Sequence, residues 1–161
     1  DMPFHKPIRL EKAIYSSLRQ PCSLTIGACH RQPIFTNRDF TLSCVDILKH
    51  YTTRHGLKCY AFCFMPDHIH LLAEASKDKS FIDIVRELKG LWTKKSWEFG
   101  FRGVIFQKSF FDHFLRKDEN IETVARYIFN NPVRAGLAEY WHEYPYLGSM
   151  VYTKEQLSGT L

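Results

Sequence analysis

The chain has 161 residues, of which 45% are hydrophobic and 15% aromatic, so it suits one domain with a real core and is excluded from the disordered class. Its formal net charge of +5 fits a polyanionic partner without identifying one. The apolar runs are too short to span a bilayer, and residues 1–10 lack the apolar segment of a signal peptide. We therefore expect a cytoplasmic protein with no membrane partner.

The length of the chain and the lack of a dividing linker predict a single domain over residues 1–161. The five cysteines are odd in number and form no Cys-x-x-Cys pair, which favours reduced thiols in the core over disulfides or a zinc site. No repeat or long linker divides the chain. The charges are spread, with one local basic cluster at Lys89, Lys94 and Lys95.

The first half of the chain predicts a strand, a helix and a hairpin. Residues 22–35 predict a strand that is interrupted near residues 31–33, and residues 40–55 predict a helix that Gly56 closes. Residues 58–64 alternate as a strand, and residues 68–75 return as its hairpin partner. On the first hairpin strand, one face is predicted to carry Tyr60, Phe62 and Phe64.

The second half predicts two helices around another strand. Residues 81–99 form the clearest amphipathic helix, and residues 105–116 predict a strand. Residues 118–131 predict a helix with Asp118 as N-cap and Pro132 as stop signal. The aromatic residues 141–161 predict a packed C-terminal extension. This order predicts an α+β fold, a ferredoxin-like split βαβ sheet with helices packed on one face.

Two histidines, His68 and His70, lie one residue apart on the predicted second hairpin strand. Side chains at i and i+2 of a strand share a face, so the two imidazoles should lie close together while Ile69 and Leu71 enter the core. Neutral imidazoles in that arrangement could chelate a divalent metal. A His-x-His triplet is also common by chance, so two half-exposed histidines with ordinary hydrogen bonds remain the alternative at this point.

The predicted helix from Asn120 offers further polar groups. Tyr127 and Asn131 are four residues apart, so they should project together from one margin of this helix. The alternative is boundary packing for Tyr127 and a simple end of the helix at Asn131.

Taken together, these segments resemble the single-tyrosine HUH transposases of the insertion-sequence type, and most of all their REP-associated tyrosine transposase branch. The resemblance is carried by FMPDHIHLL followed by ARYIFNNPVRAGL, with FQKSFFDHFLR and HEYPYLGSM also similar, and it covers most of the chain. It departs from the family in the first strand, where Ser23, Leu24 and Thr25 stand in place of a Tyr-His-Val-Thr pattern. We expect this departure to affect local packing or DNA contact and not the histidine pair.

The resemblance implies a ferredoxin-like fold with the histidines on a central strand. It implies that Tyr127 is the nucleophile and that His68 and His70 bind Mg²⁺ or Mn²⁺, with Asn131 as the remaining ligand. The implied activity is metal-dependent cleavage and rejoining of single-stranded DNA in transposition, through a 5′-phosphotyrosine. No phosphate-binding Gly-rich loop is present, so we expect no nucleotide cofactor.

The expected partner is single-stranded or hairpin DNA, bound in the cytoplasm or at the nucleoid. The candidates for DNA contact are Lys89, Lys94, Lys95, Arg126 and Arg134. We favour a monomer over a dimer by resemblance to the REP-associated branch. Two alternatives remain open: a domesticated DNA-hairpin-binding protein that no longer cleaves, and a metal-dependent phosphoesterase that uses water.

Overall fold

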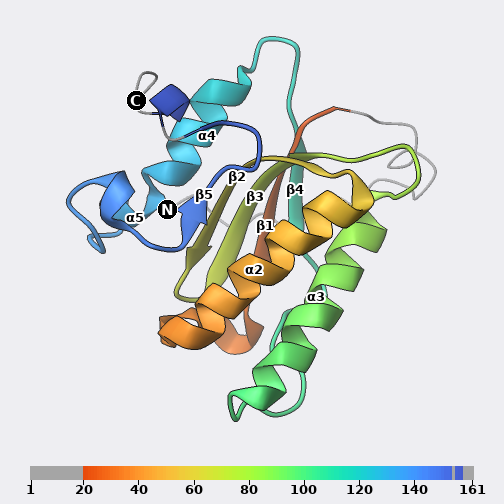
Figure 1. The fold of residues 1–161 in the computed structure, drawn as a ribbon, viewed down its shortest axis with the longest axis vertical. Helices are drawn as coiled ribbons and strands as arrows, with labels where there is room; N and C mark the ends of the chain where they lie inside the picture. The colour runs from red at the N-terminus through yellow and green to blue at the C-terminus, as the bar shows by residue number, and fades with distance from the viewer. Residues whose placement is uncertain (1–19, 154, 158–161) are drawn as a thin grey trace.

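The computed structural model describes residues 20–153 and 155–157. Within them, one antiparallel sheet carries helices on both faces (Figure 1). In chain order the strands and α-helices are β1 (Cys22–Gly27), α2 (Arg38–His55), β2 (Lys58–Met65), β3 (His68–Glu74), α3 (Phe81–Glu98), β4 (Phe111–Phe114), α4 (Ile121–Phe129), α5 (Asn131–Arg134) and β5 (Leu147–Gly148). Three single 3₁₀ turns are η1 (Cys29–Arg31), η2 (Ile34–Thr36) and η3 (Trp141–Glu143).

The sheet has the order β4-β1-β3-β2-β5, and every neighbouring pair is antiparallel. Strand β3 is inserted between β1 and β2, which is the split βαβ arrangement predicted from the sequence. The α+β fold class is therefore confirmed, and the strand with the two histidines is central. In the described part of the C-terminal segment, β5 adds to the free edge of β2.

One face of the sheet is covered by the two long helices, α2 and α3. Helix α2 begins at Asn37, whose side chain accepts a hydrogen bond from Phe40 N, and it ends at Gly56 in the left-handed conformation, with φ 65°. Helix α3 begins at Ser80, which accepts from Asp83 N. Trp92 is fully buried at the centre of this layer and donates to the Cys44 carbonyl. The amphipathic face predicted for residues 81–99 is thus the core face, except that Leu91, which was predicted to belong to it, is 45% exposed.

The other face of the sheet carries α4, α5 and the C-terminal segment. The prediction of helices on one face holds for α2 and α3 only. Strands β2 and β3 present a second apolar surface, formed by Ala61, Cys63 and Leu72, and α4 packs on it. The register of β2 slips between Cys59 and Ala61. This irregularity turns Tyr60 toward α4, so the prediction that Tyr60 shares a face with Phe62 was wrong.

Two predicted strands are shorter than their hydrophobic patterns indicated. Strand β1 ends at Gly27, and the chain then turns through His30 and Arg31, both with φ 53°. The predicted strand 105–116 is reduced to β4, with a separate bridge between Ala28 and Phe106. The interruption lies where Lys89 binds the carbonyls of residues 107 and 109, which turns these groups away from strand pairing.

The last predicted helix, residues 118–131, is divided and begins later. Asn120, and not Asp118, is the N-cap, and it accepts from the backbone N–H groups of residues 122 and 123. Helix α4 ends before Pro132, as expected, but Pro132 then lies in the first turn of α5 instead of ending all helical structure. No helix in the described residues is long and apolar enough to cross a membrane.

We predict that Leu71→Ala lowers the free energy of unfolding by about 3 kcal/mol, because Leu71 is buried under α2 and α3 and its truncation leaves a cavity. Urea denaturation measures this change. The control is Leu137→Ala, at a side chain that is 48% exposed, for which we expect a change below about 0.5 kcal/mol. Equal losses in the two variants would contradict the two-layer core.

Candidate active site

His68 and His70 lie side by side on the face of β3 that is turned toward α4. The cross-strand partners of His70 are Thr25 on β1 and Cys63 on β2, and Cys63 belongs to the apolar cluster beneath α4. Ile69 and Leu71 point the other way, into the core under α2 and α3. The predicted separation of the two faces is therefore confirmed.

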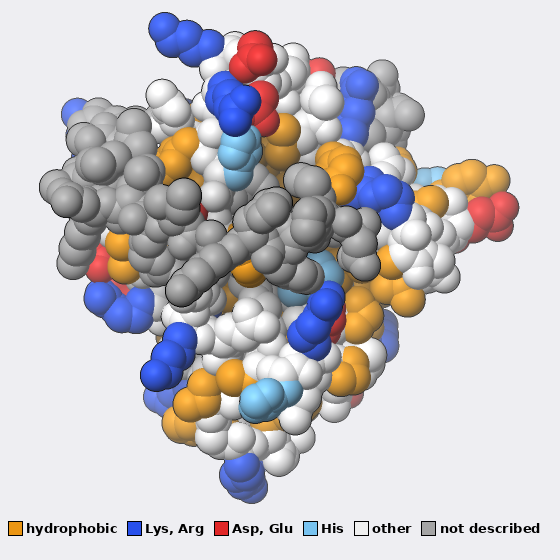
Figure 2. Space-filling view, turned by 180° about the vertical axis from the view of Figure 1, so that it is seen from behind, with side chains coloured by type: hydrophobic (Ala, Val, Ile, Leu, Met, Phe, Trp, Pro, Cys, Tyr) orange, Lys and Arg blue, Asp and Glu red, His pale blue; other side chains and the backbone are white. Residues whose placement is uncertain are grey.

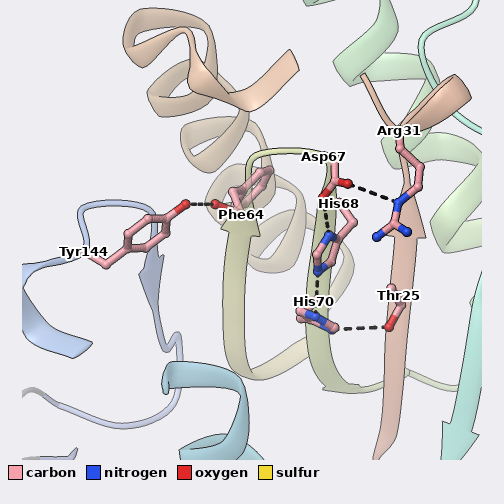
Figure 3. Close-up of polar contacts among 7 residues, drawn as sticks. All are labelled: Thr25, Arg31, Phe64, Asp67, His68, His70 and Tyr144. Carbon is pink, nitrogen blue, oxygen red and sulfur yellow. Dashed lines mark hydrogen bonds and ion pairs between the residues drawn. The ribbon is translucent and has the colours of Figure 1, made fainter. Parts of the chain in front are cut away.

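The outer nitrogens of the two imidazoles converge on one point (Figure 3). His68 Nε2 and His70 Nε2 are 3.0 Å apart, and the rings are nearly perpendicular, at 89°. Two nitrogens bound at right angles to one ion, each about 2.1 Å from it, would also lie about 3.0 Å apart. The spacing of the pair therefore fits two adjacent ligands of a shared divalent ion.

The inner nitrogens of both rings are held by oxygen atoms. His68 Nδ1 lies 2.6 Å from Asp67 Oδ1, and His70 Nδ1 lies 3.2 Å from Thr25 Oγ1 (Figure 3). The second carboxylate oxygen of Asp67 accepts from Arg31 Nε at 3.3 Å. Histidines that bind metals commonly have such a partner on the other ring nitrogen, which fixes the ring and its tautomer.

The charges around this group keep Asp67 ionised and His70 neutral. Burial opposes ionisation of Asp67, but the hydrogen bond with His68 and the charges of His68 and Arg31 hold its pKa below the usual value. Burial, His68 and the Arg134 guanidinium lower the pKa of His70 to about 3, against a weaker opposite effect of Asp67. A neutral imidazole is the form that can bind a metal.

Cys63 lies beside His70 but is not a suitable ligand. Burial raises the pKa of its thiol to about 12, so the thiol stays protonated. Within the described residues, no group of three His, Cys, Asp or Glu side chains is arranged to hold a metal. A complete protein ligand set would therefore need another residue type, such as an amide.

Tyr127 lies on α4, which packs against β2 and β3 on the histidine side of the sheet. Its side chain is 52% exposed, and in the described chain its hydroxyl makes no hydrogen bond. The Arg134 guanidinium lies over the ring, 3.8 Å from the centroid, and Nη2 donates to the Tyr127 carbonyl at 2.7 Å. The Arg134 charge also contributes to the lowered pKa of His70.

Asn131 is the first residue of α5, and its side chain is half-buried. Its carbonyl accepts from Ala135 N, so the backbone role is that of a helix residue. The structure does not connect its amide to the histidines by a hydrogen bond within the described residues. Asn131 therefore stays a candidate ligand from the sequence.

The five basic candidates fall into two groups on opposite sides of the sheet. Lys89 binds the 107–109 loop, and Lys94 and Lys95 line a groove between α2 and α3, on the face away from the histidines. Only Arg126 and Arg134, on α4 and α5, lie on the histidine side. Seen from the side away from α2 and α3, Lys and Arg side chains are scattered over the described surface (Figure 2).

Sequence reasoning missed the residues that support the histidines. Asp67 is one of them, and its position directly before His68 is the signal that the sequence offers. Sequence reasoning also missed Thr25, the threonine of the first-strand pattern, which contacts His70 directly. Strand pairing produced this contact across 45 residues of sequence.

Comparison with known proteins identifies the family. The family described as IS200-like transposases matches residues 22–131, which include both histidines and Tyr127. The chain belongs to this family. A REP-associated tyrosine transposase of Haemophilus influenzae is 30% identical over 97 residues, covering 53% of this chain and 55% of the relative. The ISDra2 transposase TnpA of Deinococcus radiodurans is 40% identical over 45 residues, 28% of this chain and 32% of that relative.

Two solved structures share the fold of this chain. A REP-associated tyrosine transposase bound to a REP hairpin superposes with a TM-score of 0.65 over 91% of this chain and 82% of the other, at 17% identity. A Deinococcus radiodurans protein described as a transposase gives 0.53 over 78% and 97%, at 21% identity. The chain spans about half the length, or less, of the curated relatives it matches.

The contact between the two Nε2 atoms requires that one of them carries a proton. With His68 neutral and its Nδ1–H donating to Asp67, His70 Nε2 is the donor in this contact, and the Thr25 hydroxyl donates to His70 Nδ1. A shift of the His70 proton to Nδ1, with Thr25 then accepting, would leave both Nε2 lone pairs facing one ion.

We predict that neutral His68 carries its proton on Nδ1, because the Asp67 carboxylate accepts it. Nitrogen-detected NMR at alkaline pH distinguishes the two tautomers. Asp67→Ala should shift His68 toward the Nε2–H tautomer, whereas Asp46→Ala, on the outer surface of α2, should leave it unchanged. An unchanged tautomer in Asp67→Ala would show that the turn carboxylate does not orient the ring.

Proposed function

We propose that this chain is a metal-dependent single-strand DNA endonuclease and strand transferase, which acts in DNA transposition through a 5′-phosphotyrosine intermediate. The observation that carries the proposal is the 3.0 Å convergence of His68 Nε2 and His70 Nε2, on the sheet face against which the helix of Tyr127 packs. Membership of the IS200-like transposase family supports this chemistry.

Tyr127 is the proposed nucleophile because its hydroxyl is exposed and is not engaged by another described residue. Its oxygen would lose its proton and attack the phosphorus, forming the tyrosine–phosphate bond, while the bond to the 3′ oxygen breaks and that oxygen takes up a proton to become the 3′ hydroxyl. The new ester preserves the free energy of the broken phosphodiester. A DNA hydroxyl can later attack it, rejoining strands without a nucleotide cofactor.

A divalent cation, Mg²⁺ or Mn²⁺, would be held by His68, His70 and Asn131 and would supply Lewis-acid stabilisation of charge on the phosphate oxygens. The donor set fits such an ion because two neutral nitrogens converge and both rings are fixed from behind by Asp67 and Thr25. Two imidazole ligands favour Mn²⁺ over Mg²⁺ in intrinsic affinity.

The proposed substrate is single-stranded DNA next to a hairpin. The structural neighbour described above is a REP-associated tyrosine transposase bound to a REP hairpin, and an exposed tyrosine can reach a phosphate most easily in an unpaired strand. Arg126 and Arg134 are the basic candidates on the correct side of the sheet for this strand. The lysines of α3 are not required by the proposal.

We predict that Tyr127→Phe abolishes the covalent protein–DNA adduct, because the variant keeps the ring but lacks the attacking oxygen. The measurement uses a labelled hairpin oligonucleotide with a single-stranded flank, incubated with Mn²⁺ and resolved on a denaturing gel. The matched control is Tyr140→Phe, at another exposed tyrosine (54%), which should keep the adduct.

The same experiment separates the alternative functions. Hairpin binding without any adduct in the wild-type protein would favour a DNA-binding protein that no longer cleaves. Cleaved DNA without an adduct would favour a phosphoesterase that uses water. An adduct that persists in Tyr127→Phe would refute the assignment of the nucleophile.

We predict that replacing both His68 and His70 by Ala removes Mn²⁺ binding, as measured by calorimetry. Asn131→Ala should weaken binding by roughly 10- to 100-fold if its amide completes the site. The control replaces His50 and His113 by Ala, at two histidines that lie outside the site. Equal binding by both double variants would contradict the metal site, and wild-type affinity in Asn131→Ala would remove Asn131 from it.

A further inference from the structure

Arg134 returns from α5 to cover the side chain of Tyr127, seven residues earlier in the chain. In a continuous helix, residues seven apart are separated by about 10.5 Å along the axis. Helix α4 ends at Phe129 and α5 begins at Asn131, so the two residues belong to separate helices, and the Arg134 guanidinium lies over the Tyr127 ring. Pro132 is buried, so the short turn that carries Arg134 is anchored to the protein.

The two contacts made by Arg134 constrain different parts of Tyr127. The guanidinium is 3.8 Å from the ring centroid, so it covers one face of the ring by cation–π stacking. The Nη2 bond of 2.7 Å to the Tyr127 carbonyl fixes the arginine to the helix from which the ring projects. A tyrosine that is half exposed would otherwise sample several rotamers, and this clamp reduces their number.

The clamp leaves most of the guanidinium available. An arginine carries five N–H donors, and in the described residues one hydrogen bond, to the Tyr127 carbonyl, is made by Arg134. A planar guanidinium stacked by its face presents its N–H groups at the edge, which suits phosphate oxygens. No comparable contact with the tyrosine ring is made by Arg126, the neighbouring basic residue on α4.

We propose that Arg134 is the positioning residue of Tyr127, holding the ring in one orientation by the stack and the carbonyl bond while its free N–H edge binds the phosphodiester that the tyrosine attacks. The inference rests on the proposed function, in which Tyr127 is the nucleophile. In this arrangement Arg134 contacts both the tyrosine and the phosphodiester, so the alignment of these two groups depends on the arginine.

The test compares Arg134→Lys and Arg134→Met with Tyr127→Phe and with Arg102→Met. Lysine keeps the charge but not the planar fork, and methionine removes the charge as well. Arg102 is a matched control because it also donates to backbone carbonyls, of Trp97 and Phe101, at the end of α3. Thermal melting of each variant verifies folding, which we expect to persist because Arg134 is exposed.

The first readout needs neither DNA nor metal. The protein is labelled with 3-fluorotyrosine, and the Tyr127 fluorine resonance is assigned by its loss in Tyr127→Phe. This resonance should shift in both Arg134 variants, because the ring then averages over several orientations. It should stay unchanged in Arg102→Met. The second readout is the single-turnover rate of adduct formation at saturating hairpin DNA. We expect this rate to fall by about 100-fold in both Arg134 variants.

The outcomes separate this inference from the proposed function. Loss of the adduct in Tyr127→Phe, together with slow adduct formation and a changed fluorine resonance in both Arg134 variants, supports the inference. A wild-type rate in both Arg134 variants, or a rate fully restored by lysine, overturns the positioning role while Tyr127 remains the nucleophile. An adduct that persists in Tyr127→Phe overturns both.

Discussion

The alternation of side chains along β3 is the constraint on which the rest of the structure depends. This strand is central, so both of its faces are covered, and successive residues must serve two different layers. Ile69 and Leu71 close the core beneath α2 and α3, whereas His68 and His70 face the layer of α4. A shift of one residue would place the imidazoles in the core beneath α2 and α3 and turn the aliphatic side chains toward α4, so the packing of the core fixes the position of the site.

Short segments next to β3 supply the side chains that hold the two histidines in place. The turn before His68 provides Asp67, the paired strand provides Thr25, and the turn after β1 brings Arg31 against the Asp67 carboxylate. Arg31 and His30 both have positive φ, a conformation that side chains rarely adopt. Unfavourable backbone geometry of this kind is tolerated where the surroundings hold it, and here an ion pair and strand pairing do so.

Long periodic segments were predictable from the sequence, and irregular ones were not. The stripes of α2 and α3, the hairpin and the shared face of His68 and His70 follow from local periods. The position of α4 on the second face does not, because it depends on packing against Ala61, Cys63 and Leu72, which are distant in the sequence. The break at Asn130 and the interruption made by Lys89 likewise depend on contacts between distant segments. The histidine pair could thus be predicted from the sequence. The contact of Thr25 with His70, the ion pair of Arg31 with Asp67 and the stacking of Arg134 on Tyr127 could not.

The pairing of β5 with β2 has a consequence for the behaviour of the chain in solution. Strand β2 is rich in aromatic and apolar residues, and without β5 it would be the exposed edge of the sheet. Unpaired N–H and C=O groups on such an edge can recruit a strand from another molecule and start aggregation. The two residues of β5, helped by the Tyr144 hydroxyl that donates to the Phe64 carbonyl (Figure 3), block this edge. The C-terminal segment therefore opposes edge-to-edge association of the sheets of two molecules, and it also packs on the second apolar layer.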